Sequence, residues 1–333
     1  MRVLAAPDKF RGSATGPQVA AAIAAAAAEH GHSCVELPLA DGGEGMLEAF
    51  GGPDRVTEVT GPLGTPVQAG WRLQDGWAVI ESALASGLQL AGGAAGNDPL
   101  RATSRGTGEL IAAAIAAGAT EITVGIGGSA MTDGGRGAVE VLAGLGRLDG
   151  SGDAPPVSVC CDVTTRYLDA APVFGPQKGA TPEQVARLRE RLVADAAWLR
   201  ADFGVDVLEV EGSGAAGGLG GGLAALGARI VPGFAHIAGV VGLAERLAEA
   251  DLVVTGEGRL DATSYAGKVV GGVLRQAEEQ GVPVLVVAGA VDPEVAGRSR
   301  AVSLSERFGL EASMGDAAGC VRAAVAEVLA AED

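Results

Sequence analysis

The chain has 333 residues, of which 48% are hydrophobic, 20% charged and 3% aromatic, and its formal net charge is −17 at pH 7. This length favours two ordinary domains over one large domain. The acidic balance excludes a general nucleic-acid-binding surface, because phosphate backbones need clustered Lys and Arg, whereas a small anionic substrate needs only a locally basic pocket.

The first 41 residues have the pattern of a strand–helix–strand unit. A short apolar run, "RVLAAPD" at 2–8, predicts a buried strand, residues 17–29 predict an alanine-rich helix, and "SCVELPLAD" at 33–41 predicts a second strand. Strands joined through a helix in this way lie parallel in one sheet.

Residues 55–90 have a different texture. Apolar and polar residues alternate between Gly-Pro and Asp-Gly pairs, which is typical of antiparallel hairpins, and Asp75-Gly76 is the strongest turn signal. We therefore expect a second subdomain here.

Alternating helices and strands return after residue 100. Helices are expected at 108–118, 135–146, 182–200, after the glycine cluster 212–222, up to 280 and at 315–331, and strands at 121–128, 157–163, 205–212, 251–258, 282–289 and 301–307. We expect an α/β fold of two domains. Residues 1–52 plus 235–333 would form an open parallel, flavodoxin-like sheet, and 53–234 an inserted mixed α/β domain; a linear two-domain split is the alternative.

Five turns in this pattern combine small residues with a charge or a hydroxyl, at 7–13, 40–45, 125–135, 212–222 and 255–261. In open parallel sheets, ligands bind beyond the carboxyl ends of the strands, where all five turns are expected. Glycine lets backbone N–H groups approach a phosphate, and a helix N-terminus favours negative charge. Such turns also favour glycine without any ligand, but five of them together favour a phosphate-binding site.

Two nucleotide-binding patterns are weak or missing. Gly212, Gly214 and Gly217 match G-x-G-x-x-G, but the acidic residue expected about 20 positions later is missing, so a dinucleotide-dependent oxidoreductase is only an alternative. Lys178 and Lys268 lack the Walker A pattern. Any nucleotide site is therefore of another type.

Phosphoryl transfer needs a cation, donors to the moving group and an orienter for the attacking hydroxyl. Acidic side chains that suit Mg²⁺ follow several expected strands, namely Asp41, Glu44, Asp133, Asp162, Glu257 and Asp261, and positive charge comes from Lys9, Arg11, Lys178 and Lys268. Each acid taken alone is equally well explained as a helix cap or turn residue. Asp162 stands out because it directly follows the apolar strand "VSVCC".

The spacing of the cysteines and the hydropathy of the chain indicate the cellular compartment of the protein. Cys34, Cys160, Cys161 and Cys320 fit neither a zinc site nor a disulfide framework, which indicates a reducing cytoplasm. Residues 19–28 resemble a signal-peptide core, but a charged turn precedes them and no apolar run reaches the ~18 residues that span a bilayer. We expect a cytoplasmic protein without a membrane or nucleic-acid partner.

Taken as a set, the motifs resemble the bacterial glycerate kinase family. They occur in the family's order, from residue 2 to about 289: "APDKFRGS", "PLADGGEG", "VTGPLG", "GTGELI", "GIGGSAMTDGG", "VFGPQKGA", "GAAGGLGGGL" and "VTGEGRLD" followed by "GK". Three departures bear on the substrate. Thr132 stands where the family often has Asn, Thr263 where Gln is common, and the segment 163–172 is shorter than usual.

The resemblance implies ATP-dependent phosphorylation of D-glycerate with Mg²⁺, in a cleft between two α/β domains. On this basis we expect Lys9, Arg11 and Ser13 to bind the substrate carboxylate. Asp162 would orient the attacking hydroxyl, and Lys268 would stabilise the transferring phosphoryl group. The ATP phosphates would be bound by Gly127, Gly128, Ser129, Thr132, Gly214, Gly217 and Gly218, and Mg²⁺ by Asp41 and Asp261.

Some alternatives stay open at this point. The chain could phosphorylate a related small hydroxy acid, or it could be a regulatory protein that binds ATP without turnover. Whether the 2- or the 3-hydroxyl of glycerate is phosphorylated, which acid binds the metal, and the oligomeric state also stay open.

Overall fold

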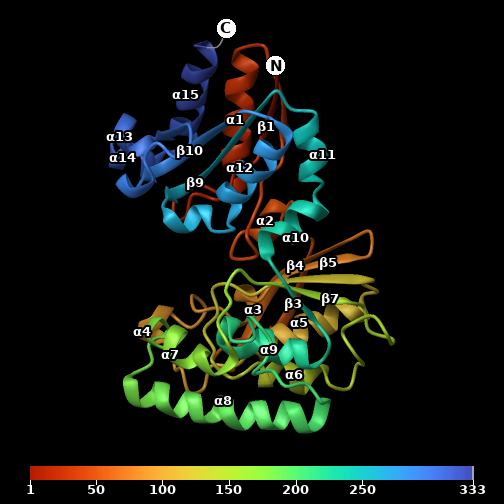
Figure 1. The fold of residues 1–333 in the computed structure, drawn as a ribbon. Helices are drawn as coiled ribbons and strands as arrows, with labels where there is room; N and C mark the ends of the chain where they lie inside the picture. Colours follow the sequence, from red (N-terminus) through yellow and green to blue (C-terminus); the bar gives the residue numbers. More distant parts are fainter. Residues whose placement is uncertain (332–333) are drawn as a thin grey trace. The chain divides into compact units, whose positions relative to one another are not determined.

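The computed structural model describes residues 1–331, which divide into two compact units (Figure 1). Unit 1 comprises Met1–Asp41, Glu48–Gly51 and the chain from Phe234 onward, and unit 2 comprises Gly42–Leu47 and Gly52–Gly233. The segment 42–47 therefore packs with unit 2, whereas the sequence layout put all of 1–52 in the first domain.

Unit 1 is built on a five-stranded sheet in which all strands are parallel. Its order is β11-β10-β9-β1-β2, with β1 (Arg2–Ala5), β2 (Ser33–Glu36), β9 (Leu252–Leu260), β10 (Val284–Val291) and β11 (Ala301–Ser303). Counted along the chain within this unit, the order is 2-1-3-4-5, which is the flavodoxin-like arrangement. The predicted fold class of this unit is confirmed.

Helices cover both faces of this sheet. They are α1 (Gly16–Glu29), α10 (Gly233–Val240), α11 (Leu243–Ala248), α12 (Val269–Gln280), α13 (Leu304–Phe308), α14 (Leu310–Gly315) and α15 (Ala317–Ala330), with 3₁₀ turns η4 (Ala262–Tyr265) and η5 (Pro293–Val295). Val3 and Ala5 pack in the core with α1 and α15, which lie side by side in Figure 1, while Leu4 packs in the core with α11 and α12. Burial on both faces explains why β1 is continuously apolar.

Unit 2 contains a six-stranded mixed sheet. Its order is β3-β4-β5-β6-β7-β8, with β3 (Arg55–Thr60), β4 (Pro66–Gln74), β5 (Trp77–Glu81), β6 (Glu121–Gly125), β7 (Val157–Cys160) and β8 (Arg229–Val231). The first three strands pair antiparallel and the rest parallel. Asp75 and Gly76 have φ of 51° and 83°, so they form the tight hairpin turn predicted from the sequence.

The remaining helical elements lie mostly in unit 2. They are α2 (Met46–Ala49), α3 (Ala83–Ser86), α4 (Gly93–Gly96), α5 (Arg105–Ala116), α6 (Arg136–Leu142), η1 (Tyr167–Asp169), α7 (Ala170–Phe174), η2 (Pro176–Lys178), α8 (Pro182–Phe203), η3 (Ala215–Gly218) and α9 (Leu219–Ala225). Thr181 caps α8 with a complete capping box. The long polar-faced helix predicted after residue 181 is therefore present and ends at Phe203 rather than 200.

The strand predicted at 205–212 is wrong. Asp206 turns the chain there: its Oδ1 accepts the N–H of Leu208 at 3.2 Å, and its Oδ2 pairs with Arg200 at 3.0 Å. Aspartate stabilises such local turns against strand pairing. The glycine cluster 212–222 therefore follows irregular chain, and the G-x-G-x-x-G match lacks the strand that a dinucleotide site requires.

The predicted strand at 301–307 is also shorter than expected. It ends at Ser303, whose hydroxyl accepts the N–H of Glu306 at 3.4 Å and so begins α13.

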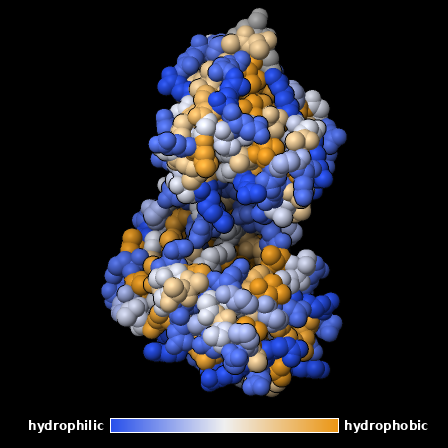
Figure 2. Space-filling model, turned by 90° about the vertical axis from the view of Figure 1, so that its left-hand side faces the viewer, coloured by the Kyte–Doolittle hydropathy of each residue, from blue (hydrophilic) through white to orange (hydrophobic). Residues whose placement is uncertain are grey.

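Figure 2 shows polar residues over much of the visible face of each unit, with apolar residues interspersed in small groups. Within residues 1–331, no helix combines the length and the apolar character that crossing a bilayer requires.

Candidate functional site

The region beyond the carboxyl ends of β1 and β9 is the first part of the candidate site. The helix that follows β1 and the helix that follows β9 cover opposite faces of the sheet, so the strand order reverses between these two strands. Ligands of open α/β sheets bind at such a switch point, outside the carboxyl ends of the strands. Beyond Ala5 the chain continues beside β9, because Ala6 N donates to Val254 O at 2.8 Å and Asp8 N to Gly256 O at 2.9 Å.

The opening loop carries the residues predicted to bind a carboxylate. Phe10 is buried and closes the loop, with its N–H donating to Ala14 O at 2.8 Å. Lys9 is half-buried, Arg11 is exposed, and the half-buried Ser13 donates its hydroxyl to Phe10 O at 3.2 Å. All three therefore lie on one turn beyond the carboxyl end of β1, and Ser13 already bonds within that turn.

Two acids beyond the carboxyl ends of these strands have raised pKa values. Burial, reinforced by the charge of Asp41, raises the pKa of Asp8 to about 6. Burial, reinforced by the charge of Asp8, raises the pKa of Glu257 to about 7. A hydrogen bond from the Ser264 side chain acts in the opposite direction and lowers this pKa. Strongly shifted carboxyl groups at the carboxyl ends of strands are candidates for a functional site.

Three residues predicted to belong to the site lie around these acids, namely Asp41, Asp261 and Lys268. Asp261 caps η4, where its Oδ1 accepts the N–H of Thr263 at 2.7 Å and that of Ser264 at 3.2 Å. Hydrogen bonds, first from the Thr263 side chain, lower the pKa of Asp261. Lys268 stands at the N-cap of α12 and donates from Nζ to Thr263 Oγ1 at 3.1 Å. Its charge and that of Asp41 both act on Asp8.

The donor set limits how these carboxylates could hold a metal. Among residues 1–331, no group of three or more His, Cys, Asp and Glu side chains lies close enough to hold a metal without help. Mg²⁺ in phosphoryl-transfer sites is usually held by one or two carboxylates together with phosphate oxygens and water. Mg²⁺ binding by Asp41 and Asp261 would have to use that mode rather than an all-protein cage, and it stays a prediction.

The loop after β6 holds the first predicted phosphate-binding residues of unit 2. A Cβ on Gly127 would lie 2.8 Å from Gly43 Cα, and one on Gly128, which has φ of 69°, would lie 2.9 Å from Glu44 Oε1. These glycines therefore permit close packing of the loop against segment 43–44. Gly128 is exposed, whereas Ser129 is buried.

Lys178 fixes the position of Ser129. It is only 3% exposed, and its Nζ donates to Ser129 Oγ at 2.9 Å and to Met131 O at 2.6 Å. Asn97 adds a second link, since its Nδ2 donates to Lys178 O at 2.9 Å and to Ala130 O at 3.1 Å. Burial lowers the pKa of Lys178 to about 7.

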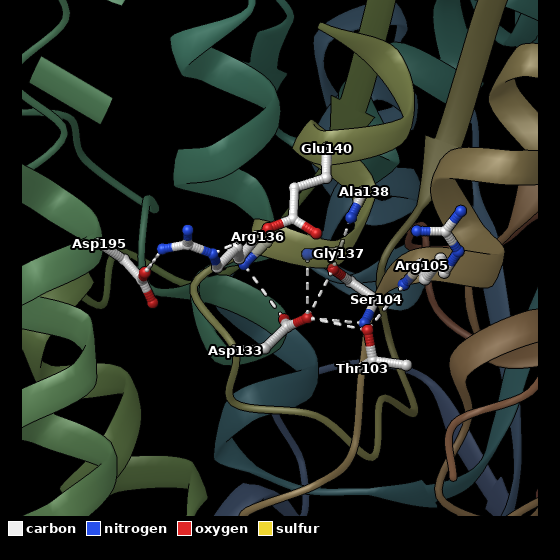
Figure 3. A network of polar contacts seen from close by, with 10 residues as sticks. Thr103, Ser104, Arg105, Asp133, Arg136, Gly137, Ala138, Glu140 and Asp195 are labelled. Atoms are coloured by element: carbon white, nitrogen blue, oxygen red, sulfur yellow. Dashed lines mark hydrogen bonds and ion pairs between the residues drawn. The ribbon is translucent and has the colours of Figure 1, made fainter. Parts of the chain in front are cut away.

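Asp133, one of the acids predicted to follow a strand, has a structural role that Figure 3 shows. Its Oδ2 accepts from Ser104 N at 2.8 Å, Ser104 Oγ at 2.9 Å and Gly137 N at 3.3 Å. Arg136 extends away from this carboxylate and pairs with Asp195 at 2.9 Å. Asp133 thus joins the starts of α5 and α6, which is the helix-cap reading of such an acid.

Thr132 differs from its neighbour Asp133. It is 1% exposed, and within residues 1–331 its Oγ1 has no hydrogen-bond partner. Thr132, Asp133 and Arg136 line a pocket of about 370 Å³ together with Pro99, Leu100, Ala102, Arg191, Ala194 and Asp195. A buried hydroxyl without a partner is a rare feature that marks a place for a ligand or water.

The glycine cluster that begins η3 and α9 serves close packing. A Cβ on Gly217 would lie 2.1 Å from Met131 O, one on Gly218 2.6 Å from Gly134 Cα, and one on Gly214 2.2 Å from Arg166 O. All three glycines are buried. The structure therefore brings this cluster against the 131–134 segment, and phosphate binding by it stays a prediction.

Asp162 follows β7 and is exposed. Its Oδ1 accepts the N–H of Gly233, the first residue of α10, at 2.8 Å. It therefore stabilises a helix start, and its predicted role in orienting a hydroxyl stays a prediction.

Sequence reasoning missed three residues. Asp8 received no role, and Glu257 and Lys178 were named only within groups of charged residues. One signal could have singled out Lys178: of the 24 basic residues in the chain only three are lysines, namely Lys9, Lys178 and Lys268. In a chain that otherwise uses arginine, the rare lysines stand out, because the two side chains are not interchangeable at a buried or geometrically defined site.

Comparison with known proteins agrees with the motifs. A family model described as the glycerate kinase family matches residues 3–157 and 145–331. A protein named glycerate 2-kinase from Escherichia coli K12 is 40% identical over 331 residues, covering 89% of this chain and 87% of the relative. Glycerate kinase from Bacillus subtilis 168 is 39% identical over 332 residues, covering 87% and 85%.

A solved structure is similar along the whole chain. It is a crystal structure from Salmonella typhimurium LT2 whose assignment as glycerate kinase 2 is provisional. It has a TM-score of 0.85 at 38% identity and covers 100% of this chain and 98% of that one.

Proposed function

This chain belongs to the glycerate kinase family and is a kinase, and from that premise we propose that it transfers the γ-phosphoryl group of ATP to a hydroxyl of D-glycerate. The observation that carries the proposal is the 40% identity to a named glycerate 2-kinase over 89% of the chain. The switch point of the unit 1 sheet supports it, because the charges of Asp41, Lys9 and Lys268 all act on Asp8 there.

The proposed product is 2-phosphoglycerate. Its support is the name of the relative from Escherichia coli, glycerate 2-kinase. In this reaction the 2-hydroxyl oxygen forms a bond to the γ-phosphorus, the bond from that phosphorus to the β–γ bridging oxygen breaks, and ADP leaves. The hydroxyl proton passes to a carboxylate, for which Asp162 is the residue predicted from the sequence.

For the substrate carboxylate we propose the loop of Lys9, Arg11 and Ser13. Arg11 is exposed and its guanidinium can make two parallel hydrogen bonds to a carboxylate. Lys268, at the N-terminus of the 12-residue helix α12, supplies positive charge toward the transferring phosphoryl group.

For the nucleotide phosphates we propose the loop after β6, with the exposed Gly128 and its neighbour Gly127 offering backbone N–H groups. The unpartnered hydroxyl of Thr132 supports this assignment, because it can donate to a phosphate oxygen. Ser129 is held by Lys178 and contributes through its position. Gly214, Gly217 and Gly218 shape the neighbouring turn.

Asp41 and Asp261 would hold Mg²⁺, which neutralises charge on the phosphates when it is bound. Asp261 is suited to this role because hydrogen bonds already favour its ionised form and fix its position.

A coupled assay of ADP release tests the proposal. The panel contains D-glycerate, D-lactate, glycolate and tartronate at saturating ATP and Mg²⁺. The proposal expects the highest kcat/KM with D-glycerate. A higher value with another acid would identify a kinase of a related hydroxy acid, and ATP binding without turnover of any acid would identify a regulatory protein. Fluorescence of NADH should not change on mixing with the protein.

A further inference from the structure

Glu257 has a carboxylate oxygen with an unused hydrogen-bonding capacity. Its Oε1 is buried, and no group within residues 1–331 donates a hydrogen bond to it. Buried polar atoms in folded proteins nearly always have a partner, and one without a partner calls for an explanation such as a missing ligand. A buried polar oxygen without a hydrogen bond is costly, because it has lost its water.

The position of Glu257 links this oxygen to the substrate. The pairing of β1 with β9 ends at Val254, and Glu257 lies three residues further along β9, beyond the carboxyl end of β1. Asp8 N donates to Gly256 O at 2.9 Å, so the opening loop continues alongside Glu257. A Cβ on Gly258 would lie 3.1 Å from Arg11 N. The proposed carboxylate-binding loop therefore adjoins the segment that carries Glu257.

The neighbouring acids Asp8 and Asp261 already accept hydrogen bonds from the backbone. Asp8 Oδ1 accepts the N–H of Lys9 at 2.7 Å, and Asp261 Oδ1 accepts two backbone N–H groups of η4. Among these three acids, Glu257 is the one with a buried oxygen lacking a partner within the described chain.

We propose that Glu257 Oε1 accepts a hydrogen bond from a hydroxyl of the substrate, and so selects short carboxylic acids that carry a hydroxyl at a fixed distance from the carboxylate. The inference rests on the proposed function, because the loop of Lys9 and Arg11 must hold the carboxylate. Glu257 is thus a specificity-determining residue that touches substrate. A binding site with a positioned hydrogen-bond acceptor discriminates against substrate analogues that lack the matching donor, because the acceptor is then left unpaired.

The test compares three ligands on two variants. Calorimetry measures Kd for D-glycerate, D-lactate, which lacks the 3-hydroxyl, and 3-hydroxypropionate, which lacks the 2-hydroxyl. Glu257→Met removes both oxygens at similar side-chain length, and Glu257→Gln keeps one uncharged acceptor. Glu278→Met, on the exposed face of α12, is the matched control.

The expected result has three parts. Glu257→Met weakens binding of D-glycerate about 10- to 100-fold, Glu257→Gln weakens it less, and one of the two deoxy analogues shows no change. The melting temperature of Glu257→Met is lowered only slightly, because the substitution removes a buried oxygen without a partner together with one hydrogen bond from Ser264.

Two results would overturn the inference. One is an unchanged Kd of D-glycerate in Glu257→Met, and the other is equal weakening for all three ligands. Either leaves the proposed function standing if the wild-type protein phosphorylates D-glycerate. Absence of that activity in the wild-type protein overturns the proposed function, and with it the inference.

Discussion

Lys178 Nζ donates to Ser129 Oγ at 2.9 Å inside unit 2, where the lysine is almost completely buried. The second bond of the same nitrogen, to Met131 O at 2.6 Å, ties it to the other side of the loop. One amine therefore sets the shape of the segment that we propose to bind ATP phosphates.

Lys178→Met is expected to lower kcat/KM for ATP at least about tenfold, because both bonds to the loop are lost and misplacement of a binding group is costly. Lys178→Arg is not expected to restore activity, since a planar five-donor guanidinium does not fit a buried site with two acceptors. Steady-state kinetics with varied ATP measure the effect. Arg187→Met, exposed on α8, is the control, and equal kinetics of the Lys178 and Arg187 variants would contradict the role.

Stability should also depend on pH through Lys178. Burial lowers its pKa from the ordinary 10.5 to about 7, so between these values the folded state binds fewer protons than the unfolded state. The free energy of unfolding therefore rises with pH in that window. We expect wild type to gain about 2 kcal/mol between pH 7 and pH 9 relative to Lys178→Met. Urea unfolding at both pH values measures this difference, and parallel pH profiles would show that the lysine is not deprotonated by burial.

Gly217→Ala should destabilise the protein strongly. Its φ is 71°, and the new Cβ would lie 2.1 Å from Met131 O. We expect a loss of at least about 3 kcal/mol of unfolding free energy, from left-handed strain and overlap with backbone. Gly144→Ala, whose Cβ has no heavy atom within 4 Å, should stay within about 0.5 kcal/mol of wild type. A Gly217→Ala protein as stable as wild type would refute the packing role of this glycine.

Asp261 allows a metal role to be separated from a capping role. Asparagine can still cap η4 through its side-chain oxygen, so Asp261→Asn should keep the melting temperature while raising the Mg²⁺ concentration needed for half-maximal activity about tenfold. Asp261→Ala should lose about 1 kcal/mol of stability as well. The control is Asp316→Asn, which affects the cap of α15. Unchanged Mg²⁺ dependence in Asp261→Asn would remove this residue from the metal site.

Arg11 and Asp162 carry the two remaining roles predicted from the sequence. Arg11→Ala should raise KM for D-glycerate, and Asp162→Asn should lower kcat, each by at least about tenfold, or roughly 1.4 kcal/mol. Asparagine at 162 keeps an oxygen for the N–H of Gly233, so the fold is expected to persist. If both variants turned over D-glycerate like Arg275→Ala on α12, these assignments would be abandoned.

Much of the fold was predictable because local signals and burial agreed. The apolar run at Val3–Ala6 is buried on both faces of a parallel sheet, and Asp75-Gly76 adopts the positive φ values that a tight hairpin needs. The strand prediction for the segment 205–212 was wrong. Alternating apolar and acidic residues are typical of a strand, but the Asp206 carboxylate accepts the N–H of Leu208 and turns the chain.

The site was less predictable, because spacing along the chain does not reveal a side chain's partners. Asp133 and Glu257 were alike in sequence, each an acid near an expected strand end. In the structure the Asp133 carboxylate accepts hydrogen bonds from five N–H and O–H donors. One oxygen of Glu257 has no donor in the described chain. Burial of Lys178 depends on the loop that contains Met131, 47 residues earlier in the chain, and no local pattern carries that information.

The most direct measurement is ³¹P nuclear magnetic resonance of a reaction containing the protein, ATP, Mg²⁺ and D-glycerate. The account predicts that the γ-phosphate signal of ATP disappears while ADP and a phosphomonoester of the 2-hydroxyl appear in equal amounts. An unchanged ATP spectrum, or release of inorganic phosphate without a phosphomonoester, would contradict it.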